Sequence, residues 1–309
     1  MTPSFPRGVA AALAAVVLWG AQFPVAKSAF AALDPFHLSA IRYAVAAALL
    51  AAWMIAREGT AVLRTYGRLA PVATLGIVGM TASPALVFAG LTATRPEHVA
   101  VIVALQPSMT ALADWLLRGR RPATFTIACI AAAFFGVVTV VTKGEYVLDA
   151  GRSEIVGDLL VLAGAACWVV YTMGTESLRG WPTLKITVLT LIAGSAGLIA
   201  LTGGLVAARV VAVPTAAAVA SVWAELAFLA LGGVLAAMVG WNWGNRIIGA
   251  LNAMLLLNFL PVVTFLIRFA QGERFGAPEI AGVALVVGAL AANNLYLRAK
   301  SRRQAAAAK

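Results

Sequence analysis

The sequence predicts an all-α polytopic membrane protein with ten transmembrane helices arranged as two inverted five-helix repeats. Of its 309 residues, 62% are hydrophobic and only 11% are charged, whereas soluble proteins carry about 25% charged residues. The mean hydropathy is +0.92. Because a helix needs about 20 apolar residues to cross a bilayer, ten such helices use most of the chain. This composition leaves no room for a soluble catalytic domain.

Ten apolar runs bounded by proline, glycine or charged residues give the predicted spans. The first five lie near residues 8–29, 37–56, 69–91, 98–116 and 124–141. The second five lie near residues 157–175, 186–207, 224–245, 250–267 and 277–297. The first run follows a single early basic residue, Arg7, and further spans come directly behind it. We therefore interpret it as a transmembrane helix rather than a cleaved signal peptide.

Basic residues dominate one set of loops. With the N-terminus inside, most of the 23 lysines and arginines fall in cytoplasmic loops and in the C-terminal tail, and such an excess orients membrane helices. We expect a multi-pass protein of the bacterial inner (cell) membrane with both termini in the cytoplasm. These loops also account for the net charge of +11, so no nucleic-acid partner is expected.

Matched spacings divide the chain into two halves. Gly8 precedes Trp19 by 11 residues, and Gly157 precedes Trp168 by 11. Because each half has five spans, an odd number, the second half must enter the membrane in the opposite sense, and inverted repeats of this kind place a site between the halves. Tryptophan and glycine are common in membrane helices, so chance matching is the alternative. The predicted units are a first repeat, a second inverted repeat and a basic low-complexity tail: residues 1–150, 151–300 and 301–309.

Four short motifs occur in order: Trp19-Gly20-Ala21-Gln22-Phe23-Pro24-Val25-Ala26-Lys27, Asp34-Pro35-Phe36 with Arg42, Gly157-Asp158-Leu159-Leu160, and Pro261-Val262. The set resembles the EamA-type branch of the drug/metabolite transporter superfamily over nearly the whole chain, as two family repeats. The resemblance implies a basket of ten helices that moves small metabolites, typically outward, by alternating access. Within the family the match is closest to bacterial aromatic amino-acid exporters. One departure is the absence of a Glu-Arg pair after the fourth span, although Glu273-Arg274 keeps it in the second half.

Aromatic and polar residues of the first and sixth spans are candidate substrate contacts. In each span, residues spaced i, i+3, i+4 and i+7 share one helix face. Aromatic surface with amide, hydroxyl and phenol groups would bind a ligand that has an apolar body and a few hydrogen-bonding groups, such as an amino acid. Ordinary helix packing is the alternative. The candidates are Trp19, Gln22 and Phe23 in the first span, and Trp168 and Tyr171, followed by Thr172, in the sixth.

Asn242, Asn258 and Arg42 are weaker candidates for the same role. Asparagine side chains often bond between helices, so packing is the alternative to a place in the wall of the site. Arg42 could receive a substrate carboxylate, or it could extend to the headgroups as long side chains near helix ends do.

Three prolines inside predicted spans are candidate hinge or gating positions: Pro84, Pro107 and Pro261. A proline in a membrane helix frees a carbonyl group and permits a kink. A merely tolerated kink is the alternative.

The positions of the acidic residues bear on the charge of the expected substrate. All twelve fall in predicted loops or close to helix ends, whereas proton-driven pumps usually place an ionisable group at mid-membrane depth. His37 and His98 lie at predicted helix starts, where an interfacial role is favoured over a proton relay. We therefore expect a neutral or zwitterionic substrate.

The sequence as a whole predicts a membrane carrier that exports small neutral or zwitterionic metabolites, amino acids and aromatic ones among them, by alternating access through a central cavity between the halves. A channel or facilitator pore is the alternative. An intramembrane enzyme is a more distant one, because the chain has no H-E-x-x-H and no G-x-S-x-G pattern. No catalytic residue, metal site or cofactor is expected, and the expected partners are the small-molecule substrate and the lipid bilayer.

Overall fold

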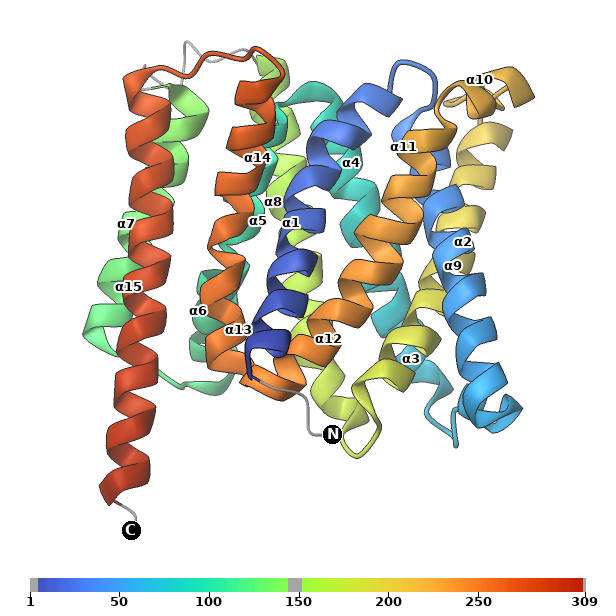
Figure 1. The fold of residues 1–309 in the computed structure, drawn as a ribbon. Helices are drawn as coiled ribbons and strands as arrows, with labels where there is room; N and C mark the ends of the chain where they lie inside the picture. The colour runs from blue at the N-terminus through green and yellow to red at the C-terminus, as the bar shows by residue number, and fades with distance from the viewer. Residues whose placement is uncertain (1–4, 144–151, 308–309) are drawn as a thin grey trace.

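The computed structural model describes residues 5–143 and 152–307, and every regular element within those ranges is a helix. Ten helical spans there are long and apolar enough to cross a membrane. Figure 1 shows them standing side by side with both ends of the chain at the same end of the bundle. The predicted all-α fold with ten spans is confirmed.

The first five spans are α1 (Phe5–Ala29), α2 (Pro35–Glu58), the run α3, η2 and α4 (Leu69–Leu75, Gly76–Ala82 and Ser83–Ala93), the pair α5 and α6 (Pro96–Ala104 and Gln106–Arg118) and α7 (Thr124–Thr142). The second five are α8 with η3 (Arg152–Gly174 and Thr175–Leu178), α9 (Thr183–Ala207), the run α11, η4 and α12 (Trp223–Ala227, Phe228–Ala236 and Ala237–Ile248), the pair α13 and α14 (Ala250–Leu257 and Phe259–Ala270) and α15 (Ala277–Ala307). The short helices η1 (Thr60–Leu63) and α10 (Ala216–Ser221) lie in connections. All ten predicted spans overlap these elements, and α15 extends well past its predicted end.

Asp34 and Pro35 set the start of α2. The Asp34 carboxylate accepts hydrogen bonds from the backbone amides of Phe36 and His37 at 3.0 and 3.1 Å. An N-cap of this kind satisfies two of the amides that a helix leaves free at its start, and a proline in the first turn has no amide to satisfy. The motif of the second span is therefore a helix-start signal.

The two halves are interrupted in corresponding spans. The third and eighth spans each pass through a π-helical stretch, η2 and η4. The fourth breaks at Leu105 and the ninth at Asn258, and Pro107 and Pro261 follow these breaks. Pro84 lies in the first turn of α4, directly after η2. A proline lacks the amide that would continue the helical hydrogen bonds, so all three predicted prolines lie where a span departs from regular α-helix.

The spans pack in a two-fold pattern. The first contacts the eighth and the third contacts the sixth, while the fifth pairs with the tenth and the second with the seventh. Glycines permit the closest approaches: a Cβ added at Gly136 of α7 or at Gly282 of α15 would lie 2.8 Å from the carbonyl oxygen of the other glycine. Gly90 of α4 and Gly157 of α8 meet in the same reciprocal way. This pattern fits two repeats related by a two-fold axis.

We expect Gly282→Ala to lower the stability of the folded protein by about 1–3 kcal/mol, because the added methyl group would press on a backbone oxygen that cannot move freely. Gly288→Ala is the matched control on the same helix, because a Cβ there meets nothing within 4 Å. Alanine is the better helix former of the two residues, so this variant should be neutral or slightly more stable. Thermal unfolding in detergent compares the two, and equal melting temperatures would contradict the close contact.

Candidate functional site

A polar pair lies inside the bundle where α1 meets α2. Arg42 Nη1 donates a hydrogen bond to Gln22 Oε1 at 3.1 Å. Gln22 is seven residues before the end of α1, and Arg42 is seven residues after the start of α2, which places both about 10 Å inside the helix ends. Arg42 is only 3% exposed. Its side chain is therefore enclosed by protein, and the expectation that it could extend to the headgroups is wrong.

The surroundings of Arg42 are aromatic rather than acidic. Its guanidinium carbon lies 3.9 Å from the ring centre of Phe88 and 4.9 Å from that of Tyr43, which are cation–π distances. Among the residues that the structure describes, no carboxylate oxygen lies within 4.0 Å of the guanidinium nitrogens. The Arg42 Nε atom and the hydroxyl of Ser39, one turn earlier, are buried without a hydrogen-bond partner.

The other predicted contacts of the first span have different surroundings. The Trp19 indole donates a hydrogen bond to the Gly233 carbonyl oxygen of η4 at 3.1 Å, and its ring centre lies 5.4 Å from that of Trp241. Phe23 is 1% exposed and belongs to the apolar core. The structure thus gathers Trp19 and Gln22 against η4, and it places Phe23 in the packing between helices.

The predicted contacts of the sixth span form a second group with α9. The ring centres of Trp168 and Tyr171 are 5.1 Å apart, and the Tyr171 hydroxyl lies 3.3 Å from that of Thr190. Asn242 of α12 donates a 3.5 Å hydrogen bond to the hydroxyl of Thr187. These residues are therefore joined by side-chain contacts within α8 and between α9 and its neighbours.

Asn258 occupies the break between α13 and α14. The residue is 4% exposed, and the nitrogen of its side-chain amide is buried without a hydrogen-bond partner. The residue therefore presents an unsatisfied donor inside the bundle, next to the interruption that precedes Pro261.

A cleft of about 360 Å³ opens between α6 and α8 at the end of the bundle that carries the termini, called the termini end below. Pro107 and Thr172 are among its lining residues, whereas the predicted contacts on α1 are not. At its mouth, Arg118 donates two hydrogen bonds to the Glu176 carboxylate, at 3.3 and 2.9 Å. The residues that line it include Pro107, Thr110, Asp114, Thr172, Met173 and Glu176.

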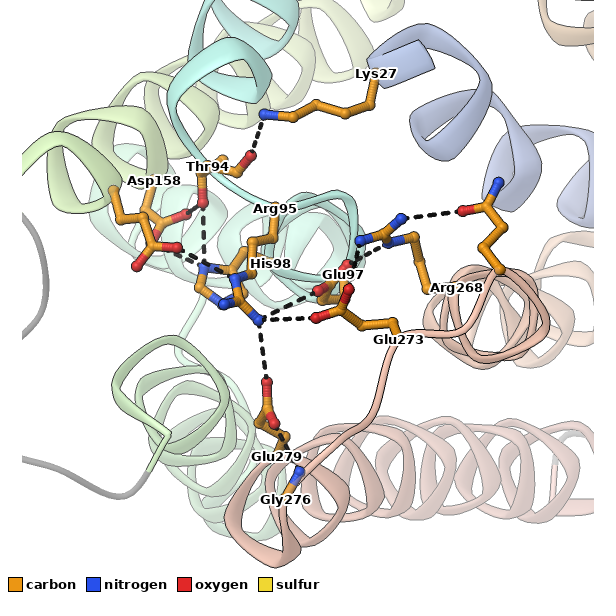
Figure 2. A network of polar contacts seen from close by, with 12 residues as sticks. Lys27, Thr94, Arg95, Glu97, His98, Asp158, Arg268, Glu273, Gly276 and Glu279 are labelled. Atoms are coloured by element: carbon orange, nitrogen blue, oxygen red, sulfur yellow. Dashed lines mark hydrogen bonds and ion pairs between the residues drawn. The ribbon is translucent and has the colours of Figure 1, made fainter.

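The opposite end of the bundle, called the far end, is held together by charged side chains (Figure 2). Arg95, between α4 and α5, lies 3.2 Å from Glu154, 3.4 Å from Glu273 and 3.8 Å from Glu279. These carboxylates all belong to the second half of the chain. One arginine of the first half thus contacts three acidic residues of the second.

Glu97 and Arg268 form a further ion pair of this group. Glu97, in the first turn of α5, has no exposed surface, and one of its oxygens accepts a 3.3 Å hydrogen bond from Arg268 Nε of α14. Arg268 also donates to Glu273 at 3.0 Å. The pair continues the contacts of Arg95, so these side chains form one set, the far-end network.

His98 belongs to the same network. Its Nδ1 atom lies 3.1 Å from the hydroxyl of Thr94 and 3.3 Å from a carboxylate oxygen of Asp158 on α8, and the histidine is completely buried. The expected interfacial role for His98 is therefore wrong, because the ring is enclosed where α5 meets α8. Lys27 at the end of α1 donates hydrogen bonds of 2.7, 3.0 and 2.8 Å to the carbonyl oxygens of Leu91, Thr92 and Thr94.

Sequence reasoning missed the far-end network because each member lies close to a helix end, where a charged side chain normally contacts water. The available signal was the run Arg95-Pro96-Glu97-His98, which places three titratable residues at the start of one span. Two members, Asp158 and Glu273, also belong to motifs of the resemblance. The structure gives these motif residues a role in joining the two halves.

Glu97→Gln should lower stability by about 3 kcal/mol, because it removes one partner of a buried ion pair and leaves Arg268 incompletely compensated. Glu176→Gln at the termini end is the control, because its pair with Arg118 is partly exposed and exposed pairs contribute little. Thermal unfolding of the purified variants in detergent measures both. A small and equal shift for the two would show that the far-end network does not hold the halves together.

Comparisons with known proteins give consistent results. The model of the EamA-like transporter family matches the chain twice, over residues 6–142 and 155–295. The chain is 31% identical to the uncharacterized transporter YrdR of Bacillus subtilis over 303 residues, which are 96% of this chain and 94% of the relative. It is 30% identical to the uncharacterized transporter YyaM of the same organism over 281 residues, 90% of this chain and 91% of the relative. Among solved structures, a crystal structure of a protein aligns with a TM-score of 0.66 at 25% identity, over 95% of this chain and 99% of the other.

Proposed function

Because the chain belongs to the EamA-like transporter family, we propose that it is a carrier that exports small neutral or zwitterionic metabolites, such as amino acids and aromatic ones among them, by alternating access. The observation that carries this proposal is the contrast between the two ends of the bundle. The far end carries the partly buried far-end network, while the termini end has a cleft of about 360 Å³. Such a contrast is what one state of an alternating carrier requires.

The proposed substrate contacts are the polar and aromatic residues between these two ends. Polar groups inside the membrane are costly and usually serve a purpose, and the unpartnered atoms of Ser39, Arg42 and Asn258 support a site that a ligand completes. Trp19 and Trp168 offer aromatic surface for an apolar side chain. The full set is Trp19, Gln22, Phe23, Arg42, Trp168, Tyr171, Asn242 and Asn258.

The proposed transport cycle exchanges the two closures. In the other state the far-end network separates and the cleft between α6 and α8 closes, with Arg118 and Glu176 drawn into a less exposed pair. Pro84, Pro107 and Pro261 are proposed as the bending points, since each lies at a break in a span. We place the termini end in the cytoplasm of a bacterial cell, following the basic loops, so the state described here would be open to the cytoplasm.

Counterflow in proteoliposomes tests the carrier proposal directly. Vesicles loaded with unlabelled phenylalanine or tryptophan should take up the labelled amino acid in a saturable way, and other amino acids should compete better than nucleosides or organic cations. Ion currents in planar bilayers without saturable counterflow would indicate a channel instead. Failure of all aromatic amino acids to compete would overturn the aromatic assignment.

Gln22→Ala should raise the half-saturating substrate concentration about tenfold, because losing a hydrogen bond to a charged group costs on the order of 1.5 kcal/mol. Asn294→Ala is the matched control: this buried amide of α15 donates a 3.2 Å hydrogen bond to the Met254 carbonyl oxygen, and neither residue belongs to the proposed set of substrate contacts. The control should lose stability without a change in half-saturation. Equal loss of folded yield and transport in both variants would make Gln22 a packing residue.

Cysteine labelling tests the coupling between the two ends. In a background with Cys129→Ala and Cys167→Ala, Thr110→Cys should react with a maleimide reagent in detergent, because Thr110 lines the cleft. Adding Glu97→Gln and Arg268→Gln should slow this reaction, since a weakened far-end network shifts the population toward the state with a closed cleft. Thr124→Cys, exposed at the same end, should be unaffected. An unchanged rate at position 110 would show that the two ends are not coupled.

A further inference from the structure

Arg42 differs from the basic residues of the far end in what surrounds its charge. Arg95 and Arg268 each contact two or more carboxylates, and Lys27 contacts three carbonyl oxygens. Arg42 has one amide oxygen, from Gln22, and two aromatic faces. Within the described part of the chain it is a fully enclosed cation that has no carboxylate beside it.

The guanidinium group has an edge free for a ligand. Nη1 is the nitrogen that bonds to Gln22, and Nε is buried without a partner. Nε and Nη2 together form the edge that binds a carboxylate through two parallel hydrogen bonds. The hydroxyl of Ser39, also buried without a partner, lies one turn away along α2. Two buried donors without partners therefore lie one turn apart on α2.

A buried charge that lacks its counter-ion costs several kcal/mol, and an apolar or amide side chain in its place would avoid this cost. We propose that the counter-ion is the carboxylate of the transported solute, bound at the Nε and Nη2 edge of Arg42 while Gln22 holds Nη1. This assignment rests on the proposed carrier function and deepens it, because it names the group by which the solute is recognised.

The same geometry makes the amino group of a solute dispensable. The acidic side chain of α2 nearest in sequence, Asp34, is the N-cap of that helix and pairs with His37, and Glu97 is held in the far-end network by Arg268. An ammonium group placed beside Arg42 would meet a like charge in a medium of low dielectric constant. The site therefore extends the proposed substrates from zwitterions to anionic carboxylates, and it rejects amines that lack a carboxylate.

Four solutes with one phenyl ring separate the contribution of the carboxylate from that of the amino group: L-phenylalanine, L-phenylalaninamide, 3-phenylpropionate and phenethylamine. Each competes in counterflow, and each is also tested for thermal stabilisation of the protein in detergent, which reports binding without transport. We expect the two carboxylates to bind at least tenfold more tightly than the two solutes without one. In Arg42→Gln the ratio of the affinity for L-phenylalanine to that for L-phenylalaninamide, the ratio of acid to amide affinity, should fall close to one. Arg42→Lys should keep a reduced preference for the acid.

Lys185→Gln is the matched control. Lys185 is a buried cation of α9 that lies 4.5 Å from the ring centre of Tyr66 and 4.7 Å from that of Trp181, at the other end of the bundle. This variant should keep the wild-type ratio of acid to amide affinity.

The outcomes separate the two proposals. Equal affinity of wild-type protein for acid and amide, or an unchanged ratio in Arg42→Gln, overturns the assignment of Arg42 and leaves the carrier proposal standing. Stabilisation by the acids alone without any counterflow supports the site and overturns the carrier. If Arg42→Gln does not fold, the wild-type ratio and the Arg42→Lys variant decide the question, because both measurements use folded protein.

Discussion

Every charge enclosed by this bundle must be compensated by the protein or by what it binds, because the surrounding hydrocarbon offers neither water nor counter-ions. The far-end network satisfies this constraint with three acidic residues around Arg95 and a shared pair between Glu97 and Arg268. Since the members come from both halves of the chain, the same contacts that compensate the charges also hold the halves together. Arg42, which is more deeply buried than any other lysine or arginine that the structure describes, has no carboxylate partner, and this directs attention to the interior between α1 and α2.

Helix packing inside a bilayer depends on close contact between helices rather than on the compensation of charge. Lipid tails are as apolar as the side chains that they would be exchanged for, so close van der Waals contact between helices replaces the hydrophobic effect. Reciprocal glycine contacts between α7 and α15, and between α4 and α8, provide it. They bring backbone against backbone between the fifth and tenth spans and between the third and sixth spans. Gly157, which precedes Trp168, takes part in the second pair. Gly8, which precedes Trp19, packs differently: a Cβ added there would lie 2.7 Å from the side chain of Ile247 of α12.

Local sequence was sufficient to predict what is local in the structure. Hydropathy located all ten spans, and the prolines at 84, 107 and 261 indicated where the spans are interrupted. The polar contacts could not be predicted in this way, because the partners are far apart in the chain: Glu97 and Arg268 are 171 residues apart, and Arg95 and Glu273 are 178 apart. The position of a residue along its helix was also a misleading guide to its burial. His98 and Glu97 lie near a helix start, where solvent is expected, yet the neighbouring α8 and α14 enclose them.

Lys27 closes the first-helix motif, and its three hydrogen bonds to the last carbonyl oxygens of α4 have a mechanical consequence. A helix leaves these oxygens without internal partners, and the lysine gathers them from a separate span. The tip of α1 is thereby tethered to the tip of α4, below which the chain winds into its π-helical turn. We expect a displacement that begins in the third span to be carried through these hydrogen bonds to the first helix, in which Gln22 lies only five residues before Lys27.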